Sequence, residues 1–256
     1  MPSAFLFDLD GTLYTDAGAI PGAVDALAEL RRRGVPFRLV TNTTRRSRRL
    51  LAERLRSYGF AVEPDEIITA VMSGVAMLKE HKVRRVAAYV APETLEDFAD
   101  FDIRSPQPET VVIGDLGDAW DFVKLNRAFL HLMDGAELIA LQRDRYWLRG
   151  DGLALDAGPF VAALEYATGK TALVCGKPSA AFYRTALASL GALAAERPKE
   201  VVMVGDDLWG DVQGAQRAGL TAWMVRTGKF REDIVGSGGI IPDRIIGSVA
   251  ELPSLI

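Results

Sequence analysis

Short apolar runs alternate with amphipathic stretches along most of the chain. Residues 4–7 are apolar at successive positions, which is typical of a strand buried on both faces of a sheet. Residues 21–34 then place apolar side chains at helical spacing and end at a glycine, which predicts a helix. The same order recurs, with strands predicted at 35–40, 67–69, 85–90, 110–113, 137–141, 172–175, 200–204 and 221–225, and helices at 45–59, 73–80, 93–99, 122–133, 158–166, 179–190 and 212–218.

This alternation predicts an α/β fold. Right-handed crossovers join successive strands into a Rossmann-like parallel sheet with helices on both faces. The pattern restarts near Val83 and returns near Ala172, so we expect a smaller α/β domain inserted into a core that both chain ends form. The expected limits are 1–82 and 172–256 for the core and 83–171 for the inserted domain.

Polar side chains stand at four of the predicted strand ends. The carboxyl ends of parallel strands meet at one edge of a sheet, where open α/β sheets bind their ligands. Carboxylates gathered there repel one another and favour a cation with oxygen ligands, and Mg²⁺ suits a site with few protein ligands and a substrate phosphate. A lysine and hydroxyl or amide donors nearby suit a phosphoryl group. The residues are Asp8 with Asp10, Thr41 with Asn42, Lys177, and Asp206 with Asp211.

Four short motifs in chain order carry a family resemblance. The chain resembles the haloacid dehalogenase superfamily over nearly its whole length, and the insert between the second and third motifs is similar to the class IIA caps of that superfamily. Residues 157–167 and 225–230 further resemble the branch that contains phospholysine phosphohistidine inorganic pyrophosphate phosphatase. The four motifs are Asp8-Leu9-Asp10-Gly11-Thr12, Thr41-Asn42, Gly176-Lys177-Pro178, and Gly205-Asp206-Asp207 continuing to Asp211.

The resemblance implies a Mg²⁺-dependent phosphatase that works through an aspartyl-phosphate. Asp8 would attack phosphorus, and Asp10 would protonate the leaving oxygen and later deprotonate water. Thr41 would donate its hydroxyl to the phosphoryl group, and Asn42 would help to shape the same loop. Lys177 would offset the charge on the nucleophile and the phosphate.

The resemblance also implies the metal ligands. The Asp8 carboxylate, the Asp10 main-chain carbonyl and Asp206 would hold the Mg²⁺ ion. Asp211 is either a direct ligand or a partner of one. Asp207 either touches this site or is an exposed turn aspartate, and the sequence leaves both interpretations open.

Five side chains are candidates for contacts with the leaving group. Three of them lie where cap loops of similar proteins face the active site, and two arginines follow the second motif. The arginine run that contains those two also suits a solvated helix face, and they are singled out because they lie nearest Thr41. The acidic stretch at 113–118 imitates the fourth motif, and we interpret it as a turn of the cap rather than a second metal site. The five candidates are Arg45, Arg46, Arg143, Arg145 and Tyr146.

The net charge, the cysteine count and the lengths of the apolar runs limit which partners and which cellular compartment we expect. A net charge of −4 provides no general attraction to nucleic acid or to an anionic membrane surface, so neither is expected as a partner. The single cysteine, Cys175, cannot form an internal disulfide, and we find no apolar run long enough to span a membrane. We therefore expect a cytoplasmic protein whose partner is a small phosphorylated substrate, and a homodimer stays open.

Two other functions remain open on the sequence alone. A phosphomutase uses the same scaffold, and a non-enzymatic phospho-receiver also places an aspartate, a threonine and a lysine at strand ends. A receiver is shorter and needs no acid or base two residues after its aspartate, so Asp10 favours an enzyme. The sequence does not specify whether the cleaved bond is a phosphomonoester, a phosphoamide or a pyrophosphate.

Overall fold

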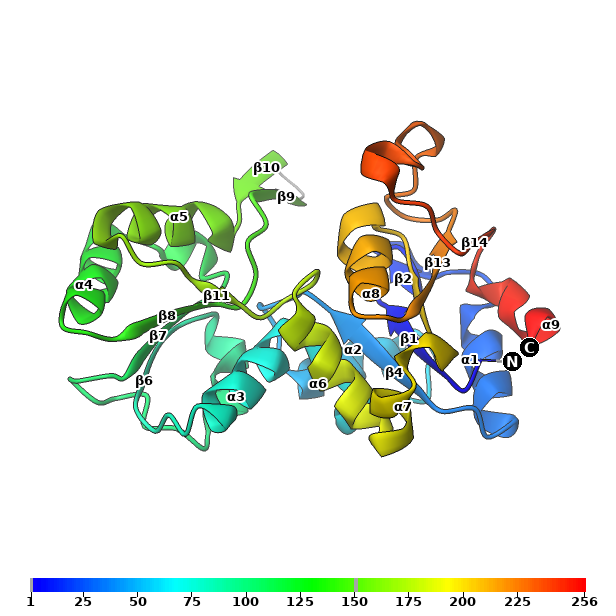
Figure 1. The fold of residues 1–256 in the computed structure, drawn as a ribbon, viewed down its shortest axis with the longest axis horizontal. Coiled ribbons are helices and arrows are strands. Elements are labelled where there is room, and N and C mark those ends of the chain that lie inside the picture. Colours follow the sequence, from blue (N-terminus) through cyan, green and yellow to red (C-terminus); the bar gives the residue numbers. More distant parts are fainter. Residues whose placement is uncertain (1, 150–151) are drawn as a thin grey trace. The chain divides into compact units, whose positions relative to one another are not determined.

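The computed structural model of the chain describes residues 2–149 and 152–256 (Figure 1). Tertiary contacts divide the chain into two compact units. Unit 1 comprises Met1–Thr41, Arg48–Ile68 and Lys177–Ile256, and unit 2 comprises Asn42–Ser47 and Thr69–Gly176. Within the described residues, no helix has both the length and the apolar character that a membrane crossing requires.

Unit 1 is built on a six-stranded sheet with the strand order β14, β13, β12, β1, β4, β5. The pairs β1–β12, β1–β4, β12–β13 and β13–β14 are parallel. The strands are β1 (Ala4–Asp8), β4 (Phe37–Thr41), β5 (Ile67–Thr69), β12 (Val201–Gly205), β13 (Thr221–Val225) and β14 (Arg244–Ile246), with a small hairpin of β2 (Tyr14–Thr15) and β3 (Gly18–Ala19). The helices are α1 (Ala23–Arg32), α2 (Arg48–Ser57), α6 (Ala180–Leu190), α7 (Ala192–Glu196), α8 (Gly214–Arg217) and α9 (Leu252–Leu255).

Strand β1 is buried along its whole length because its side chains alternate between two cores. Phe5 and Phe7 pack on the side of α1 and α2, and their rings stack with centroids 5.6 Å apart. Ala4 and Leu6 belong to the other core, with α6 and α8. Helices therefore cover both faces of a parallel sheet, and the α/β fold class predicted from the sequence is confirmed.

Unit 2 has its own four-stranded parallel sheet, in the order β11, β8, β7, β6. Helix α3 packs on one face, and α4 and α5 pack together on the other (Figure 1). An antiparallel hairpin of β9 and β10 stands apart from this sheet. The strands are β6 (Val86–Tyr89), β7 (Thr110–Ile113), β8 (Glu137–Ala140), β9 (Tyr146–Arg149), β10 (Gly152–Leu155) and β11 (Leu173–Val174), and the helices are α3 (Ala70–Glu80), α4 (Phe122–Met133) and α5 (Ala157–Thr168).

Two elements group differently from the sequence prediction. The sequence predicts the strand at 172–175 in the core sheet, but β11 pairs with β8, with Leu173 opposite Ile139. Helix α3 falls outside the predicted insert, yet Val71 and Val75 pack in the same core as Val112. Contacts thus group α3 and β11 with the strands between them, and the domain limits 1–82, 83–171 and 172–256 stay a prediction.

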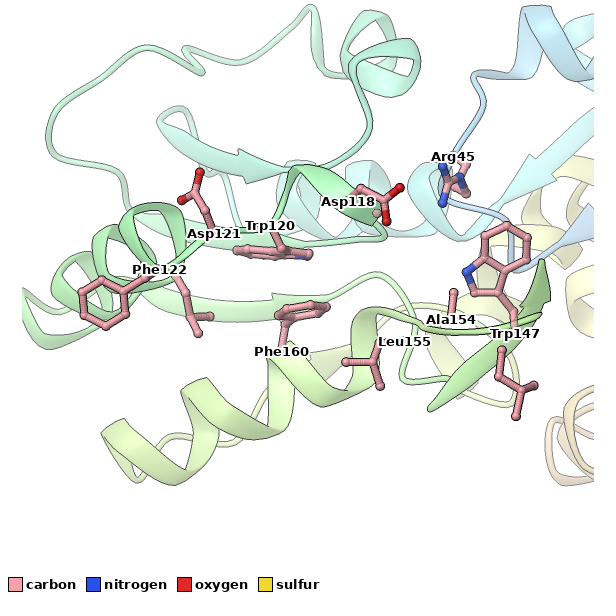
Figure 2. Close-up of a pocket in the computed structure, with 12 residues that line it drawn as sticks. Arg45, Asp118, Trp120, Asp121, Phe122, Trp147, Ala154, Leu155 and Phe160 are labelled. Carbon is pink, nitrogen blue, oxygen red and sulfur yellow. The ribbon is translucent and has the colours of Figure 1, made fainter. Parts of the chain in front are cut away.

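The hairpin of β9 and β10 is a further difference. The sequence analysis predicts no strand between residues 141 and 172, whereas the chain pairs in antiparallel fashion there, with Ala154 opposite Trp147 (Figure 2). Leu153 and Leu155 of β10 are exposed, so the apolar side chains of this strand do not form the buried face that would mark a strand in the sequence.

Candidate active site

The carboxyl end of β1 carries a buried carboxylate beside a buried lysine. Asp8 is the last residue of β1, and its Oδ1 accepts a hydrogen bond from Lys177 Nζ at 2.5 Å. The same ammonium group lies 2.6 Å from Oδ1 of Asp211. All three side chains are buried, where an unpaired charge is strongly penalised. Lys177 therefore holds two carboxylates together at this edge of the sheet.

Asp206 completes a cluster of three buried carboxylates. It directly follows β12, the neighbour of β1 in the sheet. One carboxylate oxygen from each of Asp8, Asp206 and Asp211 lies within 4.8 Å of the others. Oxygen ligands at this spacing match the needs of a hard divalent cation.

The negative charge of this cluster exceeds what Lys177 balances. Burial, together with the charges of Asp8 and Asp211, raises the pKa of Asp206 to about 8. Burial also raises the pKa of Asp211 to about 6, against the attraction of Lys177, and it raises the pKa of Asp8. Carboxylates that resist ionisation in this way would be relieved by a cation among them, so the donor set fits a divalent metal ion.

Three glycines make room for the carboxylates. Gly11 and Gly228 have positive φ angles of 81° and 61°, and a Cβ atom on either would lie about 2 Å from Asp206 Oδ2, at 2.1 and 1.9 Å respectively. A Cβ atom on Gly205 would lie 2.2 Å from Asp211 Oδ2. Side chains other than hydrogen at these positions would displace the acidic groups.

Asp207 acts as a helix cap and an ion-pair partner. Its Oδ1 accepts hydrogen bonds from the main-chain N–H groups of Trp209 at 2.9 Å and Gly210 at 2.8 Å. Lys229 Nζ lies 3.3 Å from Asp207 Oδ2. Burial tends to raise the pKa of Asp207, but the Gly210 hydrogen bond and the Lys229 charge outweigh it and lower the pKa. Asp207 is therefore neither a fully exposed turn residue nor a member of the three-carboxylate cluster.

Two residues outside the candidate set support this site. The main-chain N–H of Lys229 donates to Asp206 Oδ2 at 2.7 Å. The buried Tyr183 donates its hydroxyl to the carbonyl oxygen of Gly210 at 2.7 Å, which steadies the turn that carries Asp211. Lys229 lies in the stretch 225–230 that resembles the family branch, whereas Tyr183 is an ordinary apolar-face residue of α6 in the sequence and carries no functional signal.

Asp10 and Thr41 flank Asp8 at the same sheet edge of unit 1. Asp10 lies two residues beyond Asp8 and is exposed to solvent. Burial, and then the charge of Asp10, raises the pKa of the Tyr14 phenol. Thr41 is the buried last residue of β4, the strand that pairs with β1 on the side opposite β12. Asp8, Asp10 and Thr41 thus stand at or just beyond the carboxyl ends of two neighbouring strands, and the catalytic roles of Asp10 and Thr41 stay predictions.

Asn42 groups with unit 2 rather than with unit 1. A Cβ atom on Gly176 would lie 2.7 Å from Asn42 Oδ1 and 2.7 Å from the carbonyl oxygen of Leu141. The glycine that precedes Lys177 is therefore required by the close approach of the Asn42 side chain. A catalytic role for Asn42 stays a prediction.

The five substrate-contact candidates lie in unit 2. Arg45 forms an ion pair with Asp115 at 3.1 Å, and Arg143 forms one with Glu165 at 2.7 Å. Asp115 also accepts a hydrogen bond from the Gly117 N–H at 2.8 Å, so it serves a turn of unit 2. Contact with a substrate stays a prediction for all five. The other three, which are exposed, are Arg46, Arg145 and Tyr146.

Proteins of similar sequence and structure are known. A family model described as haloacid dehalogenase-like hydrolase matches residues 5–104, and one described as HAD-hydrolase-like matches residues 174–252. The chain is 44% identical over 228 residues to haloacid dehalogenase-like hydrolase domain-containing protein 2 of Bos taurus, covering 89% of this chain and 85% of that protein. The chain belongs to the haloacid dehalogenase-like hydrolase family.

Two further proteins are similar to this hydrolase, one in sequence and one in structure. It is 37% identical to the human phospholysine phosphohistidine inorganic pyrophosphate phosphatase over 258 residues, which cover 98% of this chain and 93% of the relative. The solved structure of the p-nitrophenyl phosphatase from Archaeoglobus fulgidus superposes with a TM-score of 0.91 and 28% identity, covering 100% of this chain and 99% of the other. The resemblance predicted from the four motifs is confirmed.

Proposed function

We propose that this hydrolase is a phosphatase that removes a phosphoryl group from a small substrate through an aspartyl-phosphate on Asp8. The observation that carries the proposal is the Asp8 carboxylate at the end of β1, paired with Lys177 at 2.5 Å and placed beside Asp206 and Asp211. Such a group is buried, oriented and surrounded by charges of both signs, which suits a nucleophile toward phosphorus.

The reaction has two balanced steps. In the first, an oxygen of Asp8 forms a bond to phosphorus while the bond from phosphorus to the leaving oxygen breaks, and Asp10 gives that oxygen its proton. In the second, water attacks the same phosphorus, its proton passes to Asp10, and phosphate departs as the Asp8 carboxylate is restored. The exposure of Asp10 supports this role because protons exchange with solvent there.

The surrounding residues orient and neutralise the reacting groups. Lys177 offsets negative charge on Asp8 and on the phosphoryl oxygens. Thr41, at the end of the neighbouring strand, donates its hydroxyl to the phosphoryl group, and Asn42 helps to shape the loop that follows it. Positioning of this kind contributes roughly 7 to 11 kcal/mol to barrier lowering in well-oriented reactions.

We further propose that the bound cation is Mg²⁺. The Asp8, Asp206 and Asp211 carboxylates would hold it, with the Asp10 main-chain carbonyl as an additional ligand. The small number of protein oxygens suits Mg²⁺, which retains several waters and takes up substrate phosphate oxygens. When bound, the ion supplies positive charge that stabilises the phosphoryl oxygens.

The substrate class is a small phosphorylated molecule. Phosphomonoesters are the first choice, because the name of the similar Archaeoglobus fulgidus protein describes a p-nitrophenyl phosphatase. Phosphoamide and pyrophosphate bonds are the second, because the name of the human relative describes a phospholysine, phosphohistidine and pyrophosphate phosphatase. Arg45, Arg46 and the loop from Arg143 to Tyr146 remain the proposed contacts to the leaving group.

Phosphate release from p-nitrophenyl phosphate, sugar phosphates, nucleotides, phosphoamino acids and pyrophosphate tests the proposal, with Mg²⁺ and with EDTA. We expect Asp8→Asn to abolish turnover and leave the fold intact. Asp10→Asn should reduce turnover by about 10²-fold or more, since general acid and base catalysis are lost together. Asp65→Asn, a change of the same type at an exposed position of unit 1, is the matched control and should behave as wild type.

Two outcomes would contradict this assignment. Full activity in Asp8→Asn excludes the aspartyl-phosphate. Transfer of the phosphoryl group to a second position of a sugar, without release of inorganic phosphate, identifies a phosphomutase instead.

A further inference from the structure

The segment 225–230 reaches the carboxylate cluster of unit 1 at two points. The hydroxyl group of Thr227 donates a hydrogen bond to the carbonyl oxygen of Gly11 at 2.6 Å, although the two residues are 216 positions apart in the chain. The main-chain N–H of Lys229 donates to Asp206 Oδ2 at 2.7 Å. The segment therefore holds both the loop that follows β1 and a carboxylate that follows β12.

The loop after β1 has three consecutive carbonyl groups with different partners. The Leu9 carbonyl accepts a hydrogen bond from the N–H of Leu13 at 2.9 Å, and the Gly11 carbonyl accepts one from Thr227. Among the residues that the structure describes, no N–H or hydroxyl group donates to the Asp10 carbonyl between them. This strong acceptor is therefore left to water or to a cation.

The direction of the Asp10 carbonyl depends on the conformation of Gly11. The N–H of Gly11 donates to the Tyr14 carbonyl at 2.7 Å, and the Asp10 carbonyl points the opposite way because a trans peptide is planar. The Thr227 hydroxyl holds the next peptide plane through the Gly11 carbonyl. Together the two hydrogen bonds restrain a glycine, which has the widest backbone freedom of any residue.

The main chains of Gly11 and Gly228 are packed directly against each other and against Asp206. A Cβ atom on Gly228 would lie 2.6 Å from the Cα of Gly11 and 1.9 Å from Asp206 Oδ2. No side chain separates the three groups, and close-packed interiors transmit strain. A displacement of the segment 225–230 would therefore move the loop after β1 and the Asp206 carboxylate together.

We propose that Thr227 is a positioning residue for the metal site. Its hydroxyl holds Gly11 while the Lys229 N–H holds Asp206, and the two contacts set the Asp10 carbonyl and the Asp206 carboxylate relative to each other. The proposal rests on the Mg²⁺ site proposed above, and it gives Thr227 no contact with the ion or with substrate. Groups that orient metal ligands in this way strengthen metal binding without touching the metal.

Isothermal titration of the full chain with MgCl₂, without substrate, tests this role. Thr227→Val keeps the branched shape but removes the hydroxyl, and it should weaken Mg²⁺ binding about tenfold. Thr227→Ser keeps the hydroxyl and should bind Mg²⁺ as wild type does. Thr221→Val is the matched control, because the Thr221 hydroxyl also donates to a carbonyl, that of Lys199 at 2.9 Å. This control should lose stability in urea unfolding but bind Mg²⁺ as wild type does.

A second measurement needs no variant. Mg²⁺ should slow the amide hydrogen exchange of Gly11 and Lys229 in the wild-type chain, because the ion fixes the ligands that these groups hold. Exchange at both amides that is unchanged by Mg²⁺ overturns the proposal.

Three titration results also overturn the proposal. They are equal Mg²⁺ affinity in wild type and in folded Thr227→Val, equal losses in Thr227→Val and Thr221→Val, and no Mg²⁺ binding by wild type. Failure of the proposed function gives a different result. A wild-type chain that releases no phosphate, but whose Mg²⁺ affinity still depends on the Thr227 hydroxyl, contradicts the phosphatase and supports the positioning role.

Discussion

At the scale of single residues, the candidate active site depends on glycines as much as on charged residues, because the carboxylates occupy space that a side chain would fill. Gly11 and Gly228 lie against the Asp206 carboxylate, where a Cβ atom on either would overlap Oδ2. Both also have positive φ angles, which side-chain-bearing residues rarely adopt. The position of Asp206 in the carboxylate cluster therefore requires glycine at two points far apart in the chain.

Gly11→Ala should weaken metal binding by about tenfold or more, because the new methyl group would displace the Asp206 carboxylate from the cluster. The measurement is the Mg²⁺ concentration needed for half-maximal phosphatase activity. Gly18→Ala is the matched control: Gly18 also has a positive φ angle, of 121°, but nothing lies within 4 Å of its added Cβ. Equal losses in the two variants would show that backbone strain, and not the contact with Asp206, is responsible.

Lys177→Met should lower the free energy of unfolding by about 3 kcal/mol in EDTA at pH 8, because Asp8 and Asp211 lose their shared counter-charge. The loss should be smaller at pH 5, where protonated carboxyl groups need no counter-charge. Urea unfolding at the two pH values measures the difference. Lys199→Met, at an exposed lysine, should change stability little at either pH, and a pH-independent loss in Lys177→Met would contradict the role of this ion pair.

The sequence identified most of the charged residues of the site because they stand at or just beyond predicted strand ends. Asp8 and Asp206 follow this rule, whereas Asp211 lies further along the turn after β12 and was identified through the fourth motif of the family resemblance. Tyr183 could not be found in this way, because its hydroxyl reaches Gly210 from a helix whose pattern is purely apolar. Contacts made by main-chain atoms, such as the hydrogen bond from the Lys229 N–H to Asp206, likewise cannot be found from residue type, because almost any residue can make them.

At the scale of elements, two helices of unit 2 begin with aspartates in contrasting surroundings. Asp156 precedes α5, is buried, and accepts a hydrogen bond from the Ala157 N–H at 2.7 Å. Burial raises the pKa of Asp156 to about 6. Asp121 precedes α4 at the surface, and its hydrogen bonds with Lys124 lower its pKa.

Between about pH 4 and pH 6 the folded chain therefore binds more protons at Asp156 than the unfolded chain does. The stabilising contribution is complete below pH 4 and is lost as the pH rises through 6, by roughly 3 kcal/mol at most. Asp156→Asn should remove this slope from urea-unfolding measurements made between pH 4 and pH 7. Asp121→Asn should instead remove a contribution that grows as the pH rises. An unchanged slope in Asp156→Asn would contradict the assignment.

The prediction of helices and strands succeeded where the apolar periodicity is strong. It failed where the structure of a segment depends on the strand with which it pairs. The helix predicted at 122–133 is α4, Phe122–Met133, because its apolar spacing is regular. The hairpin of β9 and β10 was missed, because the leucines of β10 are exposed and do not mark a buried face of a strand. The sequence predicted β11 as a strand but assigned it to the wrong sheet, because an apolar run does not indicate the strand with which it pairs.

At the scale of the whole molecule, two units with separate cores should respond separately to ligands. A ligand bound to the folded state at 100 times its dissociation constant adds about 2.7 kcal/mol of stability. Amide hydrogen exchange should therefore show Mg²⁺ protecting β1, β12 and the turn at Asp211 in unit 1. Unit 2 contains none of the proposed metal ligands, so its strands should be protected much less.

Asp206→Asn supplies the control, since it should reduce the protection of unit 1 by Mg²⁺. Protection of both units by Mg²⁺ to the same extent, with no change in Asp206→Asn, would contradict a metal site confined to unit 1.

The sequence by itself determined the α/β class, the family and the acidic and basic residues at the strand ends, because residue type and spacing carry that information directly. Only the tertiary structure decided which sheet β11 joins, that Lys177 bridges Asp8 and Asp211, and that Tyr183 contacts the turn that carries Asp211. These features depend on which groups far apart in the chain come within a few ångströms of each other. The hydrophobic pattern of a segment indicates whether it forms a helix or a strand, but it does not indicate which distant segment it contacts.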